Sequence, residues 1–284
     1  MPYDLAKFKN RSWGIMEEYK KEFALVLAET GALFFDEGLV LKDGRPTPYF
    51  VNMAMFKTGR LSRKLGSFFA AMMVSNNIAN QTDIILGPSY KGSAIALSTS
   101  ISLWEEYGID LTYECDRKEP KDHGEASKGK SLFVNNSFFP GCRIFVVDDV
   151  ATSMGTKHEL LEKLHRQASN NSFDYSIVGV GIGIDREQTG PVYDPQGRVI
   201  LGKRGINAIE EFSRITRVPV YPVARIREIV NYLYRERIPV LIKGKRRPID
   251  DDTKNAFDSY LDTYGTVDGS SWKGINGKYP ISHK

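Results

Sequence analysis

The chain has 284 residues, of which 41% are hydrophobic and 26% are charged, and its formal net charge is +4. This balance is typical of a globular protein that holds one large α/β domain or two small ones. Two cysteines cannot make a disulfide framework, no apolar stretch is long enough to span a bilayer, and the first residues have no signal-peptide core. We therefore expect a cytoplasmic protein with no membrane segment. Its mild positive charge suits an anionic small molecule as well as a nucleic acid.

The first eighty residues predict a helix, a hairpin and a second helix. Apolar residues recur at helical spacing over residues 12–30 and 60–78. Between them lie β-like runs over residues 32–41 and 48–56, separated by a turn that contains Asp43-Gly44. Asp-Gly between two such runs is a hairpin signal.

From residue 83 onward, short apolar runs alternate with helical segments. Strands are predicted over residues 83–86, 109–115, 143–147, 175–184 and 218–222. Helices are predicted over residues 92–107, 155–167, 207–212 and 226–235. This alternation predicts an α/β fold with a parallel sheet and right-handed crossovers. The polar segment 243–284 carries Lys-Gly-Lys-Arg-Arg and then three aspartates, which predicts an appendage to the core.

Residues 124–131 match the nucleotide-binding P-loop pattern letter for letter. A true P-loop leaves a buried strand and opens a helix, whose N–H groups meet the phosphates. Here a charged run precedes the match, and Asn-Asn and Phe-Phe-Pro-Gly follow it. The space before the next strand is too short for a helical crossover. We therefore reject an NTPase function.

An acidic pair follows the predicted strand 143–147. Asp148 and Asp149 would lie at the carboxyl edge of a parallel sheet, where α/β proteins bind ligands. Hydroxyls and free N–H groups follow at a helix N-terminus, from Thr152, Ser153, Gly155 and Thr156. Such a turn suits a phosphate, and the carboxylates suit sugar hydroxyls, so a phosphorylated sugar fits both. An ordinary strand, turn and capped helix is the alternative.

Four other segments each have a functional and a plain interpretation. Residues 117–125 are a cationic loop suited to a mobile lid, or a solvated surface loop. Residues 87–92 are a glycine-flanked turn that could hold an anion, or a tight turn with a surface lysine. Lys42 lies in what could be a simple hairpin turn. Arg186 could pair bidentately with a carboxylate substrate, or form an ion pair with Asp185 or Glu187.

These segments together resemble a known family. Residues 144–156 resemble the phosphoribosyl diphosphate (PRPP) motif of type I phosphoribosyltransferases. Four other segments resemble the orotate phosphoribosyltransferase family in its own order, at residues 41–52, 87–92, 117–125 and 185–187. The resemblance spans about residues 20–240 and implies a central, mostly parallel sheet flanked by helices, with a small N-terminal hood over the base site. It implies a helix and hood over residues 1–58, an α/β core over 59–242 and a polar extension over 243–284.

The resemblance also implies the activity and the role of each site residue. The expected reaction transfers the phosphoribosyl group from PRPP to N1 of orotate, through an oxocarbenium-like transition state, in UMP synthesis. Lys42, Lys121 and His123 are the expected catalytic residues. Expected PRPP-binding residues are Tyr90, Lys91, Arg117, Lys118, Lys121, His123, Asp148, Asp149, Val150, Ala151, Thr152, Ser153, Met154, Gly155 and Thr156. Expected orotate-binding residues are Lys42, Phe50, Val51, Thr152 and Arg186.

The expected cofactor is Mg²⁺ carried by PRPP, with no direct protein ligand. The expected assembly is a homodimer with shared sites, because the family's lid reaches into the neighbouring subunit. Small molecules, and no nucleic acid, are the expected partners.

Three residues depart from the family pattern. Met154 stands where a small residue is usual, Val51 stands where an aromatic residue is common, and Pro120 stiffens the lid.

Rival functions remain. A phosphoribosyltransferase for another base is disfavoured, because a neutral purine offers no carboxylate to Arg186 and Lys42. A PRPP-sensing regulator, with nucleic acid bound through residues 243–247, would not need the cationic lid. A nucleic-acid module would show a basic stripe with interleaved aromatics, which the chain lacks.

Overall fold

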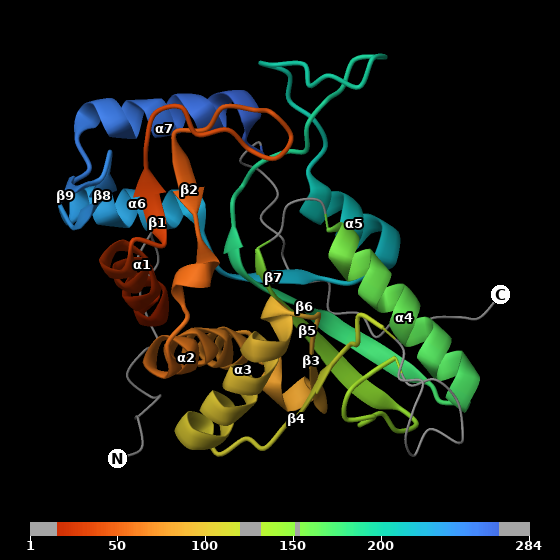
Figure 1. Ribbon diagram of the computed structural model, residues 1–284. Helices are drawn as coiled ribbons and strands as arrows, with labels where there is room; N and C mark the ends of the chain where they lie inside the picture. The colour runs from red at the N-terminus through yellow and green to blue at the C-terminus, as the bar shows by residue number, and fades with distance from the viewer. Residues whose placement is uncertain (1–15, 120–131, 151–153, 267–284) are drawn as a thin grey trace.

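The computed structural model describes residues 16–119, 132–150 and 154–266. Its strands form two sheets (Figure 1). The larger has five strands in the order β4-β3-β5-β6-β7, and the smaller has four in the order β2-β1-β8-β9. Within the described residues, no helix combines the length and apolar character needed to cross a membrane.

All neighbouring strands of the larger sheet are parallel. Its strands are β3 (Ile84–Gly87), β4 (Thr112–Cys115), β5 (Cys142–Val150), β6 (Tyr175–Asp185) and β7 (Val220–Arg225). The helices between them are α3 (Lys91–Tyr107), α4 (Gly155–Asn171) and α5 (Ala208–Thr216). The predicted alternation of strands and helices is confirmed, so the carboxyl ends of all five strands meet at one edge of the sheet.

Both faces of this sheet are covered, as the side-chain alternation of β5 shows. Phe145 and Val147 pack into a core cluster with α2 (Gly59–Ser75) and α3. Ile144 and Val146 point the other way, into a cluster with α4 and α5. Because successive strand residues face opposite sides, the continuous apolar run of β5 fits a strand buried on both faces. Figure 1 shows the two helix pairs on opposite sides of the sheet.

The smaller sheet, here called the hood, joins the two ends of the described chain. Strand β1 (Leu33–Phe35) pairs antiparallel with β2 (Tyr49–Val51) and parallel with β8 (Pro239–Ile242). The hairpin that was predicted between residues 32–41 and 48–56 is therefore present, with much shorter strands. Around the hood lie α1 (Glu18–Thr30), α6 (Ile226–Arg235) and α7 (Asp251–Tyr264). Short 3-10 turns at Met53–Met55 and Ala79–Gln81 flank α2.

The described residues after 243 are part of the fold, contrary to the predicted appendage. Strand β9 (Lys245–Pro248) completes the hood by pairing with β8, and this hairpin crosses the domain boundary expected at residue 243. Helix α7 buries Phe257 and Leu261 completely. The Phe257 ring lies 5.3 Å from that of Tyr49 on β2. The polar residues at the start of the segment made this apolar face hard to recognise in the sequence. One of them, Asp250, caps the helix by accepting from the Thr253 N–H at 2.9 Å.

Candidate active site

Most predicted site residues that the structure describes lie where strands of the larger sheet end. Tyr90 and Lys91 follow β3, Arg117 and Lys118 follow β4, Asp148 to Val150 end β5, and Arg186 follows β6. Because the strands are parallel, these ends lie on the same side of the molecule, which is where ligands bind in open α/β sheets. Lys121, His123, Ala151, Thr152 and Ser153 lie outside the described residues, as does the P-loop-like stretch 124–131. Their roles remain predictions.

The position of Met154 explains how a large residue fits where the family usually has a small one. Met154 adopts a left-handed conformation, with φ of 57°, immediately before the helix. Its side chain is buried in the cluster beneath α4 and α5. A large residue therefore fits here, because the side chain occupies the core. Gly155 and Thr156 open α4, and Thr156 is exposed.

The two aspartates at the end of β5 have different partners. Asp148 is buried, and its Oδ2 forms an ion pair with the ammonium of Lys157. Asp149 is more exposed, and its Oδ2 pairs at 2.7 Å with Lys91, whose side chain is 57% exposed. Burial raises the pKa of Asp148, and the nearby Lys157 opposes this shift. Asp149 is thus the carboxylate paired with an exposed lysine.

The turn after β3 is pressed against β5 and needs its glycines. A Cβ on Gly87 would lie 1.9 Å from the carbonyl oxygen of Gly92, and a Cβ on Gly92 would lie 2.9 Å from that of Val147. No side chain fits at these distances, so the first and last residues of Gly-Pro-Ser-Tyr-Lys-Gly are required sterically. The turn presents Tyr90, which is 76% exposed, and Lys91 at the start of α3.

The residues after β4 are tied to this same turn. Asp116 accepts the Ser89 N–H at 2.6 Å and pairs with Lys163 of α4. The Lys118 ammonium lies 5.2 Å from the centroid of the Tyr90 ring. Arg117 points elsewhere: its Nε donates to the carbonyl oxygen of Phe133 at 3.1 Å. The structure therefore brings Lys118 and Tyr90 together, and engages Arg117 with Phe133.

Arg186 is a buried cation that directly follows β6. Its side chain forms no ion pair with Asp185 or Glu187 in the described part of the chain, and its Nε and Nη2 donate to no acceptor there. Asp185 instead accepts the Glu187 N–H at 2.7 Å, and Glu187 accepts the Arg227 N–H at 2.8 Å. Burial raises the pKa of Glu187 to about 7. The predicted alternative, a strand-end ion pair, is wrong.

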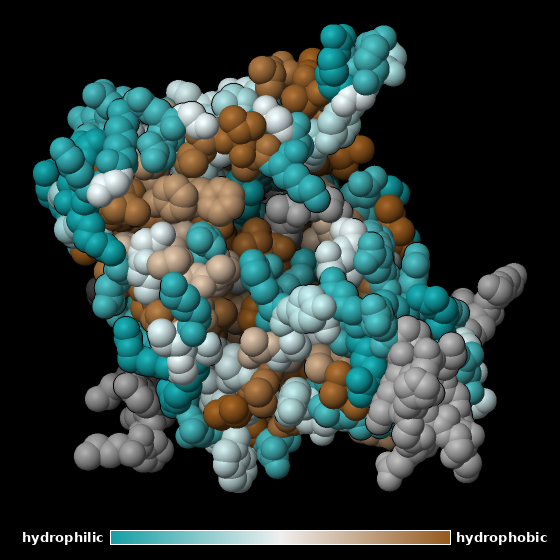
Figure 2. Space-filling view, viewed as in Figure 1, coloured by the Kyte–Doolittle hydropathy of each residue, from teal (hydrophilic) through white to brown (hydrophobic). Residues whose placement is uncertain are grey.

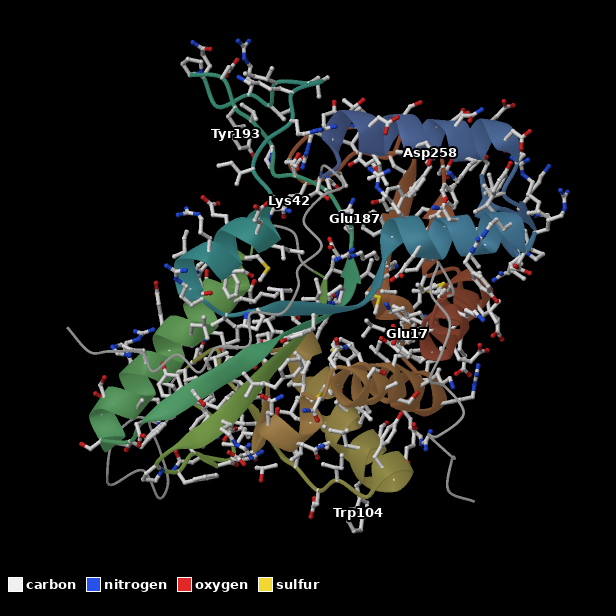
Figure 3. All side chains as sticks on the ribbon, turned by 180° about the vertical axis from the view of Figure 1, so that it is seen from behind. Glu17, Lys42, Trp104, Glu187, Tyr193 and Asp258 are labelled. Carbon is white, nitrogen blue, oxygen red and sulfur yellow. The ribbon has the colours of Figure 1, made fainter. Side chains whose placement is uncertain are left out.

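The hood supplies the remaining predicted residues. Lys42 is exposed in the turn between β1 and β2, and Figure 3 shows it on the same side of the molecule as Glu187. The ring of Phe50 is 37% exposed and lies 5.8 Å from that of Phe34. The Val51 side chain is buried in the core, so only its backbone is free to meet a substrate.

Two groups of residues near the site were missed by the sequence prediction. Lys157 and Lys163 read as surface lysines of an amphipathic helix, and only the fold brings them to Asp148 and Asp116. Arg45 is buried, pairs with Asp43 through Nε and Nη2, and donates to the carbonyl oxygen of Thr189 at 2.8 Å. It fixes the turn that carries Lys42. The short spacing Asp-Gly-Arg is its sole sequence signal.

Comparison with known proteins identifies the family. No protein-family model matches the chain. Orotate phosphoribosyltransferase of Clostridium beijerinckii is 32% identical over 250 residues, covering 88% of this chain and 99% of the relative. The enzyme of the same name from Agathobacter rectalis is 33% identical over the same coverage. The crystal structure of orotate phosphoribosyltransferase from Francisella tularensis superposes with a TM-score of 0.64 at 27% identity, covering 86% of this chain and 98% of that one. The chain belongs to the orotate phosphoribosyltransferase family.

Proposed function

We propose that this enzyme transfers the phosphoribosyl group of PRPP to N1 of orotate, giving orotidine 5′-monophosphate and pyrophosphate. The bond from ribose C1′ to the pyrophosphate oxygen breaks, the bond from C1′ to N1 forms, and N1 loses its proton. The choice of orotate as the base rests on the buried side chain of Arg186, whose Nε and Nη2 have no acceptor in the protein as far as the structure describes it. Burying a guanidinium with unpaired donors costs free energy unless an anion binds to it. Orotate has a carboxylate for this fork, whereas uracil and the purines have none.

The PRPP side of the site is supported by the groups around the end of β5. We assign the 5-phosphate to the turn 152–156, because it leads into the N-terminus of α4, where free N–H groups and the helix dipole favour an anion. Asp149 would accept hydrogen bonds from the ribose hydroxyls. Lys91, exposed and paired with Asp149, would turn to the pyrophosphate when PRPP binds, together with Lys118. Arg117, held by Phe133, would support the lid.

The lid residues remain predicted from sequence. We expect Lys121 and His123 to neutralise charge that develops on the leaving pyrophosphate, and to keep water from the oxocarbenium-like transition state. Lys42 would act from the hood side, near the base. These roles share one physical purpose, which is to place cations around a polyanionic pair of substrates.

Magnesium fits this site as an ion carried by the substrate. Within the described residues, no three acidic, histidine or cysteine side chains come together in a way that would hold a metal. Mg²⁺ keeps several waters and is often bound through substrate phosphates. When bound, it would neutralise the pyrophosphate. Asp149 and Asp148 lie at the strand end that would face its outer shell.

We further propose that the enzyme is a homodimer with shared sites. Helix α3 leaves three large apolar side chains uncovered at helical spacing: Leu97, Ile101 and Trp104. Figure 2 shows apolar atoms over α3 at the lower edge of the visible face. Tyr90 extends this stripe by two turns toward the site, so a second copy seated on α3 would also reach the neighbourhood of Lys118.

We also place the enzyme in the cytoplasm, with small molecules and no nucleic acid as partners. The free thiols of Cys115 and Cys142 support a reducing compartment.

The assay is pyrophosphate release from PRPP and Mg²⁺ with one base at a time. We expect release with orotate and none above background with uracil, adenine or hypoxanthine. Release with a purine and not with orotate would overturn the proposed function. Omitting PRPP gives the blank, and addition of a chelator tests the expected dependence on Mg²⁺.

A further inference from the structure

Asp116 is a buried carboxylate beside the turn that carries Lys91, which we propose as a ligand of the pyrophosphate. It directly follows β4, and its side chain is 8% exposed. Its Oδ1 accepts the Ser89 N–H at 2.6 Å, and the Ser89 hydroxyl donates to its carbonyl oxygen. Ser89 lies directly before Tyr90 and Lys91 in the chain. Asp116 therefore holds the turn that presents these two side chains.

The negative charge of Asp116 is unfavourable for the proposed ligand. Lys91 lies two residues after Ser89, and Lys118 lies two residues after Asp116, so the carboxylate adjoins the segments whose cations would meet a polyanion. A buried charge is screened little by salt, and like charges brought together weaken binding. A neutral asparagine could accept the Ser89 N–H just as a carboxylate does. A carboxylate at this place therefore needs a cation that neutralises it.

Lys163 supplies this cation from the middle of α4. Its ammonium forms an ion pair with Asp116 Oδ2 and donates to the carbonyl oxygen of Arg117 at 3.1 Å. Its side chain is 23% exposed, whereas that of Lys91 is 57% exposed. Both oxygens of Asp116 are thus engaged by protein groups, one by the turn after β3 and the other by α4. Lys163 is held within the protein, while the more exposed Lys91 can turn toward a substrate.

An ordinary surface ion pair is the alternative role for Lys163. Such pairs contribute little to stability, because water screens both charges. Here the carboxylate is buried, and removing the lysine would leave its charge unpaired where the strands end. The contacts of Asp116 and Lys163 also join three described parts of the fold, which are the turn after β3, the end of β4 and α4. The charge balance beside the pyrophosphate turn therefore depends on Lys163.

We propose that Lys163 is a positioning residue for PRPP: it neutralises Asp116, so that Asp116 can fix the turn at Ser89 without repelling the pyrophosphate. Lys163 acts through Asp116 and needs no contact with the substrate. This inference rests on the proposed function, because it takes pyrophosphate as the ligand of the turn. It adds to the site a side chain of α4 that the sequence prediction did not include.

The test measures PRPP affinity by titration calorimetry, with Mg²⁺ and without orotate, in Lys163→Met, Lys163→Arg, Asp116→Asn and the double variant D116N/K163M. K163M should weaken PRPP binding about tenfold or more, because it leaves a buried carboxylate unneutralised beside the pyrophosphate. K163R should bind nearly as wild type does, because it keeps the cation. D116N and the double variant should bind at least as tightly as wild type, since asparagine keeps an acceptor for the Ser89 N–H and carries no charge.

Lys64→Met is the matched control. It breaks the Lys64–Glu22 pair between α2 and α1, in which the lysine side chain is 30% exposed, and it should bind PRPP as wild type does. All affinities are measured well below each variant's melting temperature, so a variant that is only less stable would bind normally.

The double variant separates the effect of charge from that of a broken contact. If D116N/K163M binds as weakly as K163M, the contact and not the charge matters, and the proposal is overturned. Normal binding by K163M overturns it as well. If K163M does not fold, D116N decides: affinity equal to or above that of wild type supports the proposal, and weaker affinity overturns it. A wild-type protein that binds no PRPP refutes the proposed function, whereas a wild type that binds PRPP no better than K163M does refutes this inference alone.

Discussion

The guanidinium of Arg186 lies over the ring of Tyr49, with Cζ 5.6 Å from the ring centroid. Tyr49 belongs to the hood and Arg186 follows β6 of the larger sheet, so this contact joins the two sheets at the site. The Tyr49 hydroxyl also donates to the carbonyl oxygen of Arg186, at 3.4 Å. The ring packs against the guanidinium, whose Nε and Nη2 have no acceptor among the described residues and can meet a planar carboxylate.

Arg186→Met should lower kcat/KM for orotate about 100-fold, because the orotate carboxylate would lose its charged partner in a buried place. PRPP affinity should stay unchanged, since Arg186 serves the base. Steady-state kinetics with either substrate varied gives both values. Arg198→Met, which removes an exposed arginine paired with Asp194, is the matched control. An equal loss for both substrates would show that Arg186 is structural.

Lys91→Met should weaken PRPP binding about tenfold to 100-fold, as expected for a charge-assisted hydrogen bond to pyrophosphate. The loss should shrink as NaCl is raised, because salt already screens the exposed lysine in the wild type. Calorimetry at two salt concentrations checks this. If the variant binds PRPP like wild type at low salt, Lys91 has no part in the pyrophosphate site.

The parallel core was predictable from sequence because its strands carry continuous apolar runs, which a strand buried on both faces requires. The predicted helix over residues 226–235 matches α6. Helix α7 was missed because Asp251 and Asp252 in its first turn look like a solvated run, although acidic residues are favourable at a helix N-terminus. The buried apolar residues of this helix, such as Phe257 and Leu261, recur only at every third or fourth position, and they come after the acidic first turn in the sequence.

The strand-end residues of the site were predictable for a different reason. Asp148 directly follows the apolar run of β5, Arg186 directly follows β6, and Lys91 follows β3 after a short turn, so the topology alone brings them to one edge. The partners of these residues were not predictable. Lys157 lies nine positions from Asp148, and only the geometry of the turn decides whether its long side chain reaches inward or points to solvent.

Ile101→Asp should convert a dimer to a monomer at micromolar concentration, because it puts a charge in the middle of the apolar stripe on α3. Light scattering after size-exclusion chromatography measures the mass. The conservative Ile101→Leu variant should remain dimeric. A dimeric I101D protein would place the interface on another surface. If the sites are shared, the monomer should also lose most of its activity.

Phe257→Ala should destabilise the protein by about 3–5 kcal/mol, as for other buried phenylalanines, because the ring packs against Tyr49 and Phe35. Asn255→Ala, on the exposed side of the same helix, should change stability by less than about 0.5 kcal/mol. Urea unfolding followed by circular dichroism compares the two. A negligible effect of F257A would restore the view of this segment as an appendage.

Glu187 makes the fold sensitive to pH. Burial raises its pKa from 4.5 to about 7. Its carboxylate accepts the Arg227 N–H, and it forms no ion pair within the described part of the chain. A carboxyl whose pKa is higher in the folded state binds its proton more tightly there than in the unfolded state. Its contribution to stability is therefore complete below pH 4.5 and is lost as the pH rises toward 7 and beyond.

Glu187→Gln should consequently stabilise the protein more at pH 8 than at pH 5, by about 2–3 kcal/mol in the difference. Glutamine keeps an acceptor for the Arg227 N–H but carries no charge to bury. Urea unfolding of both proteins at the two pH values supplies the four free energies. Other carboxyls with raised pKa, such as Asp148 and Asp185, are present in both proteins and cancel in the comparison. A gain that is equal at pH 5 and pH 8 would mean that Glu187 titrates normally, and that the pH dependence of stability arises from those other carboxyls.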